Sequence, residues 1–128
     1  MEHHTFSGTS IPKAYGAYSH AVVAGDFVFL AGQTARDSAT GSLIPGDVAS
    51  QTKRSLEIIR GILAELNLTL AHVVRSTVYL ARIEDWDAMN QAYSEVMPTP
   101  FPARSTPEVK LPYGALVSIE VTAFRGGV

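Results

Sequence analysis

Arg104 is the residue of this chain whose type and surroundings most clearly indicate chemistry. It lies in the run FPARSTPEVKLPYGALVSIEVTAF, residues 101–124, between two pairs of small residues. In an extended strand, Arg104, Thr106 and Glu108 would point to one side, because side chains alternate. A guanidinium held on a strand offers a planar fork of donors that binds a carboxylate through two hydrogen bonds. The residues alone therefore leave two interpretations of Arg104: an anchor for a ligand carboxylate, or a structural ion pair with Glu108 or Glu120.

Other familiar catalytic patterns are missing from the sequence. There is no cysteine, and no HExxH, GxSxG, GxxxxGK[ST] or GxGxxG motif, which excludes thiolate, common hydrolase and nucleotide sites. Ser19 and His20 would face opposite ways on a strand, so they cannot form a nucleophile–base pair. The adjacent pair His3 and His4 is more typical of an exposed terminal segment than of a metal site. We therefore expect no metal and no cofactor, and a reaction that needs little beyond orientation and a positioned water.

Length and composition indicate one globular domain. The chain has 128 residues, of which 46% are hydrophobic and 17% charged, and we expect a single domain over 1–128 with residues 1–10 partly mobile. The net charge of −2 and the pI of about 6.0 argue against nucleic acid as a partner, since its binders usually carry a basic face. No apolar run approaches the roughly 20 residues that span a bilayer, and the first residues lack the apolar core of a signal peptide. We expect a cytoplasmic protein with no membrane partner.

The hydrophobic pattern of the first half predicts two strands and a helix. SHAVVA and FVFLAGQT are rich in β-branched and aromatic residues and flank a Gly-Asp turn, which predicts a hairpin with strands at about 19–24 and 27–32. From Asp47 onward, apolar residues recur every three or four positions. This predicts an amphipathic helix over about 48–66, with Asp47 as its N-cap and Asn67 as its C-terminal stop.

The second half predicts a strand, a helix and two further strands. VVRSTVYLA, residues 73–81, is typical of a strand, and EDWDAMNQAYSEVM predicts a second amphipathic helix. Two strand-like segments, PARSTPEV and ALVSIEVTAF, follow and are joined by a KLPYG turn. The apolar stripe of the second helix, which we expect to be core, consists of Trp86, Met89, Tyr93 and Val96.

ALVSIEVTAF predicts a sheet with two different faces. One face of this strand is apolar and should lie under the helices, whereas the other mixes apolar and polar residues. The order ββ–α–β–α–ββ predicts an α+β fold with two helices on one face of a mixed sheet. A half-polar opposite face is poorly suited to a monomer core, so we expect an oligomer. The apolar face comprises Val117, Ile119, Val121 and Ala123, and the mixed face comprises Leu116, Ser118, Glu120, Thr122 and Phe124.

Several motifs in a fixed order resemble one known family. They are YGAYSHAV, LAGQ, TGSLIPGD, QTKRSLEIIRGILAELNLTLAHVVRSTVYL, WDAMNQAYSEVM and PARSTPEVKLPYGALVSIEVTA. Over about residues 11–125 the chain resembles the reactive-intermediate deaminase family, RidA or YjgF, also called L-PSP endoribonuclease. The resemblance implies a chorismate-mutase-like fold assembled as a homotrimer, with the sheets lining a central β-barrel and ligand sites in clefts between subunits.

The resemblance also implies a reaction and a set of site residues. The reaction is hydrolysis of 2-imino acids, or their 2-enamine tautomers, to 2-oxo acids and ammonia without cofactor or metal. Arg104 matches the family's substrate-carboxylate arginine and is the expected catalytic residue. The expected substrate-binding residues are Arg104, Tyr18, Gly32, Ala31, Asn90, Thr106 and Ser118.

The chain departs from the family pattern at several of these positions. Ser118 stands where the family's deaminases often carry a glutamate that holds the attacking water. Ala31 replaces the family's usual serine or cysteine, and Thr106 replaces a cysteine that is often found there. Serine cannot act as a general base at neutral pH as glutamate can. An alternative is therefore a non-catalytic trimer that binds small carboxylates and regulates a partner. Glu120 could support the site or be structural. The family's older name implies RNA cleavage, against which the acidic pI weighs.

Overall fold

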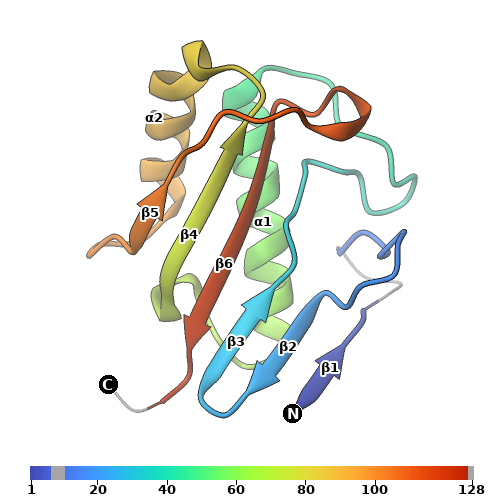
Figure 1. Ribbon diagram of the computed structural model, residues 1–128, viewed down its shortest axis with the longest axis vertical. Helices are drawn as coiled ribbons and strands as arrows, with labels where there is room; N and C mark the ends of the chain where they lie inside the picture. The colour runs from blue at the N-terminus through green and yellow to red at the C-terminus, as the bar shows by residue number, and fades with distance from the viewer. Residues whose placement is uncertain (7–10, 127–128) are drawn as a thin grey trace.

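The described residues form a six-stranded sheet and two α-helices (Figure 1). The computed structural model describes residues 1–6 and 11–126. Among them, no helix is long and apolar enough to cross a membrane. The regular elements are β1 (Glu2–His4), β2 (Ala21–Ala24), β3 (Phe27–Leu30), α1 (Val48–Glu65), β4 (Val73–Leu80), α2 (Trp86–Val96), β5 (Ala103–Ser105) and β6 (Val117–Phe124).

Both helices lie behind the sheet in the view of Figure 1, on one face of it, which confirms the predicted α+β layering. Helix α1 begins where expected, because the Asp47 carboxylate accepts a hydrogen bond from Ser50 N at 2.9 Å. It ends before Asn67, whose φ of 60° reverses the chain as a left-handed residue does. The apolar face of α1, including the fully buried Leu56 and Ile59, packs on the sheet.

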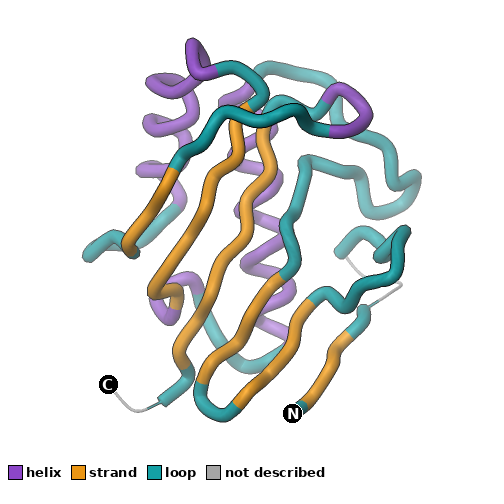
Figure 2. The backbone as a smooth tube through the Cα atoms, in the orientation of Figure 1, coloured by secondary structure: helices purple, strands orange, loops and turns teal. Residues whose placement is uncertain are grey.

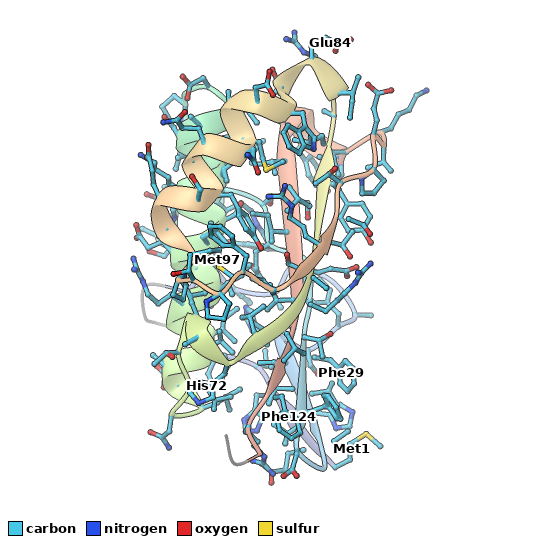
Figure 3. The ribbon with its side chains drawn as sticks, turned by 90° about the vertical axis from the view of Figure 1, so that its left-hand side faces the viewer. Met1, Phe29, His72, Glu84, Met97 and Phe124 are labelled. Atoms are coloured by element: carbon cyan, nitrogen blue, oxygen red, sulfur yellow. The ribbon has the colours of Figure 1, made fainter. Side chains whose placement is uncertain are left out.

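The alternation predicted for the last strand is confirmed. Val117, Ile119, Val121 and Ala123 are buried, while the four residues between and after them are only partly covered. The uncovered face carries an aromatic cluster at one end, where Phe27 lies 5.2 Å from Phe124 and 6.4 Å from Phe29 between ring centroids. Figure 3 shows Phe29 and Phe124 on the side of the sheet away from the helices. The mixed face is therefore open in one chain.

The last two strands of the chain do not pair with each other. The sheet order is β1-β2-β3-β6-β4-β5, so β6 lies between β3 and β4, and β5 is an edge strand (Figure 2). β5 spans three residues and pairs in parallel with β4, with Arg104 opposite Ser76. The segment after β5 runs on beside the end of β4, where Leu80 N donates to Pro107 O at 2.9 Å. Proline has no N–H to continue a ladder, which explains why the predicted eight-residue strand stops early.

The N-terminal segment contains a strand that the sequence pattern did not predict. Glu2–His4 form β1, which pairs antiparallel with β2. Of the ten residues expected to be partly mobile, residues 7–10 lie outside the described part. Phe6 N donates to Nδ1 of the buried His20 at 3.1 Å, and His20 Nε2 lies 2.8 Å from Pro12 O. Because Nδ1 accepts, Nε2 carries the proton and donates to Pro12 O. His20 is therefore a structural residue that ties the N-terminal segment to β2.

Candidate functional site

Arg104 is half-buried on β5 and points toward α2. Its guanidinium carbon lies 4.7 Å from the Tyr93 ring centroid and 5.5 Å from that of Trp86. Its Nη2 donates a 2.8 Å hydrogen bond to Asn90 Oδ1. Two aromatic faces and an amide oxygen thus fix the orientation of the guanidinium without neutralising its charge.

The ion-pair interpretation of Arg104 is wrong. Glu108 instead accepts a 2.8 Å hydrogen bond from Ile83 N, and Glu120 accepts a 2.6 Å hydrogen bond from Tyr79. In residues 1–6 and 11–126, no carboxylate forms a salt bridge with Arg104. A guanidinium has five N–H donors, and that of Arg104 donates one hydrogen bond within the described part of the chain. The free donors can therefore bind an anion.

The aromatic residues beside Arg104 each form a side-chain hydrogen bond of their own. Trp86 Nε1 donates to Thr106 Oγ1 at 2.9 Å, and the Tyr93 hydroxyl lies 2.7 Å from the Oγ of Ser76, which is fully buried. Burial raises the pKa of the Tyr93 hydroxyl above its ordinary value, so it stays neutral at pH 7. The α2 stripe predicted as core thus has a second role, because Trp86 and Tyr93 also face Arg104.

Replacing Tyr93 by phenylalanine is expected to lower the free energy of unfolding by about 1–3 kcal/mol, because the buried Ser76 hydroxyl loses its partner. Denaturant unfolding measures the change. The double variant Tyr93→Phe, Ser76→Ala should lose less than the two single variants added together, since both remove the same hydrogen bond. Strictly additive losses would show that this hydrogen bond contributes nothing to stability.

A second group of predicted site residues lines one cavity of about 850 Å³: Tyr18, Ala31, Gly32 and Ser118. The chain after β3 is tied to β6 by a two-way backbone pairing, in which Gln33 N donates to Ile119 O at 2.8 Å and Ile119 N to Gln33 O at 3.0 Å. This pairing places Gly32 beside Ser118. The two residues are so close that a Cβ added at position 32 would lie 3.1 Å from Ser118 Oγ. Glycine at 32 therefore leaves room for a small group next to the serine hydroxyl.

The family model described as Endoribonuclease L-PSP matches residues 8–125. The chain belongs to this family. It is the RidA/YjgF family that the motifs resemble, so the predicted family is confirmed.

Relatives within the L-PSP family match nearly the whole chain. A RutC family protein of Pyrococcus abyssi is 43% identical over 115 residues, covering 89% of this chain and 91% of that protein. A 2-iminobutanoate/2-iminopropanoate deaminase of Bos taurus is 38% identical over 121 residues, covering 94% and 88%. The crystal structure of a putative endoribonuclease from Thermotoga maritima has a TM-score of 0.92 at 34% identity, covering 99% and 100% of the two chains. The predicted L-PSP fold is thus confirmed, and the imine deaminase activity of relatives supports the same class of activity at the level of the family.

The seven site residues expected from the L-PSP family fall into two clusters in one chain. The first cluster contains Arg104, Asn90 and Thr106, on the side of the sheet that carries α2. The second cluster lines the cavity and reaches the uncovered face through Ser118, which alternates with buried residues of β6. One chain therefore does not bring all seven together. The sequence motifs did not predict that Trp86 and Tyr93 lie beside Arg104. They also did not predict that Tyr15 and Arg36 line the cavity.

Proposed function

We propose that this protein hydrolyses 2-imino acids and 2-enamino acids to 2-oxo acids and ammonia, without a cofactor. The single observation that carries the proposal is the state of Arg104, a preoriented guanidinium with no carboxylate partner among the described residues. A 2-imino acid carries a carboxylate that fits the planar fork of a guanidinium. The name of the Bos taurus relative, 2-iminobutanoate/2-iminopropanoate deaminase, supports the same substrate class.

The complete site in this proposal lies between two subunits of a homotrimer. Arg104 of one subunit holds the substrate carboxylate, and the cavity of its neighbour, with Tyr18, Gly32 and Ser118, receives the reacting carbon. The separation of the two clusters in one chain and the open mixed face of the sheet support this arrangement. The uncovered faces of three sheets would form the central barrel.

Orientation is the main contribution that such a site makes to catalysis. Protonation of an enamine at C3 gives the protonated imine. Water adds to C2 of the protonated imine and gives a tetrahedral carbinolamine, in which a proton moves from the added oxygen to the nitrogen. The C2–N bond then breaks, the hydroxyl group loses its proton, and ammonia, the 2-oxo acid and one proton result. The imine carbon is already electrophilic, so a fixed carboxylate and a positioned water can accelerate the reaction without a strong base.

The proposal is tested by generating imines in the presence of the protein. An L-amino-acid oxidase converts norvaline or 2-aminobutanoate to the 2-imino acid, and formation of the 2-oxo acid is followed against its spontaneous rate. We expect acceleration in proportion to the concentration of the protein, and none with the heat-denatured protein. No acceleration with any imine would exclude the deaminase function.

Ser118→Ala is expected to lower kcat/KM for these imines only about fivefold, because one neutral hydrogen bond contributes about 1 kcal/mol. The steady-state assay measures the change, and Thr122→Ser, on the same strand face, serves as the control. A loss of a thousandfold or more would show that the serine hydroxyl does more than position water.

One observation favours the second candidate, a trimer that binds small carboxylates without turning them over. Among the described residues that line the cavity, none is an aspartate, a glutamate or a histidine, so these residues include no ordinary general base. Calorimetry with 2-oxo acids separates the two candidates. Tight binding of 2-oxo acids without any turnover of imines would favour the binding protein.

A further inference from the structure

A second arginine, Arg36, lines the cavity that contains Tyr18, Gly32 and Ser118. It lies in the loop after β3, and its Nη2 donates a 3.3 Å hydrogen bond to the Tyr18 hydroxyl. Its guanidinium carbon lies 5.0 Å from the centroid of the Tyr15 ring. The cavity is therefore lined by a cation, Arg36, whereas Arg104 belongs to the other cluster.

The surrounding loop holds Arg36 in place. Arg54 Nε donates to Arg36 O at 2.9 Å, and residue 36 pairs with Leu43 across the loop. Tyr15 lies under the guanidinium against Gly41, where a Cβ would come within 2.7 Å of Tyr15 Cζ. Gly41 also has a φ of 75°, which glycine adopts without strain. Tyr15 thus packs against the loop at Gly41 and under the guanidinium of Arg36.

The charge of Arg36 is not neutralised by the described part of the chain. No carboxylate there forms a salt bridge with it, and its Nε is buried without a hydrogen-bond partner. The adjacent carboxylate, Asp37, accepts hydrogen bonds from Thr40 N at 3.0 Å and Ala39 N at 2.9 Å instead. An unpaired cation in a cavity without acidic residues attracts an anion.

We infer that the substrate carries a second carboxylate, which Arg36 binds, so that the preferred substrates are 2-imino dicarboxylic acids. This inference rests on the proposed function, in which Arg104 of the adjoining subunit takes the carboxylate next to the imine. A substrate with one carboxylate leaves Arg36 unpaired in the complex, whereas a dicarboxylate pairs both cations. Arg36 is then a specificity-determining residue that acts on the distal end of the substrate.

The kinetic test compares two imines that differ in the terminal group alone. Oxidation of glutamate yields 2-iminoglutarate, and oxidation of norvaline yields 2-iminopentanoate. We expect kcat/KM to favour the dicarboxylate by about ten- to hundredfold, the ratio typical of a charge-assisted hydrogen bond. In Arg36→Gln this ratio should fall to about one or below. Arg60→Gln, which removes the same charge from an exposed position on α1, should keep the wild-type ratio.

A binding measurement decides the inference independently of turnover. Titration with 2-oxoglutarate and 2-oxopentanoate should show at least tenfold tighter binding of 2-oxoglutarate to the wild type and to Arg60→Gln, but not to Arg36→Gln. Equal affinity for the two acids, or an undiminished preference in Arg36→Gln, would overturn the inference. Failure of the proposed function looks different: neither imine is turned over, whatever the two oxo acids show.

Discussion

Arg104→Ala is expected to lower kcat/KM for 2-imino acids by at least about a hundredfold. A guanidinium binds a carboxylate through two charge-assisted hydrogen bonds worth about 1.5–3 kcal/mol each, and about 1.4 kcal/mol corresponds to a tenfold change in rate. In the native protein the fork is oriented by Tyr93, Trp86 and Asn90, so little entropy is lost when substrate binds. The coupled oxidase assay at varied substrate concentration measures kcat and KM separately.

Two control variants separate charge from geometry at this position. Arg104→Lys keeps the positive charge but loses the planar fork, so it should recover part of the lost affinity and remain below the wild type. Arg60→Ala removes an arginine from the exposed surface of α1 and should leave the kinetics unchanged. Full activity in a folded Arg104→Ala protein would contradict the assignment of Arg104 as the carboxylate anchor.

Phe29→Asp is expected to convert the protein from a species of three times the 13.7 kDa chain mass into single chains, and to abolish imine hydrolysis with it. The Phe29 side chain is 48% exposed on the uncovered face of the sheet, as Figure 3 shows, and this face would line the trimer interior. A carboxylate buried there without a partner opposes assembly by several kcal/mol. The fold of the single chain should survive, because Phe29 contributes little to the core between sheet and helices.

Sedimentation measures the mass of the Phe29 variants, and circular dichroism checks that they are folded. Phe29→Leu keeps an apolar side chain and is the matched control, which should stay assembled and active. A wild-type mass equal to one chain would refute the trimer, and an assembled Phe29→Asp protein would show that this face is not the interface.

Local patterns predicted the elements whose signals lie within one segment. Helix α1 shows this best, because Asp47 and Asn67 bound its apolar periodicity and act as expected at the two ends. The alternation along β6 likewise predicted which residues are buried. The partner of β5 could not be predicted in this way, since its register depends on β4, about thirty residues earlier, as the pairing of Arg104 with Ser76 shows.

The candidate site was predictable in part for the same reason. The motifs predict Arg104, Tyr18 and Gly32 as site residues. The side chains that contact Arg104 and Tyr18 come from other segments of the chain. Trp86 and Tyr93 fit a core stripe in sequence, and only the packing of α2 beside β5 brings them to Arg104. Arg36 lies in a loop with no periodic signal, so its place in the cavity follows from the pairing of that loop with β6.

The division of the site residues into two clusters has a consequence for how such a protein can diversify. The cluster around Arg104 and the cluster around Arg36 share no hydrogen-bond partner among the described residues, so changes in one should be nearly independent of the other. In the proposed function, the Arg104 cluster would bind the carboxylate common to all amino-acid-derived substrates, and the Arg36 cluster would contact their variable end. Substitutions in the loop that carries Arg36 would then change the range of substrates. The binding of the common carboxylate and the fold itself would stay the same.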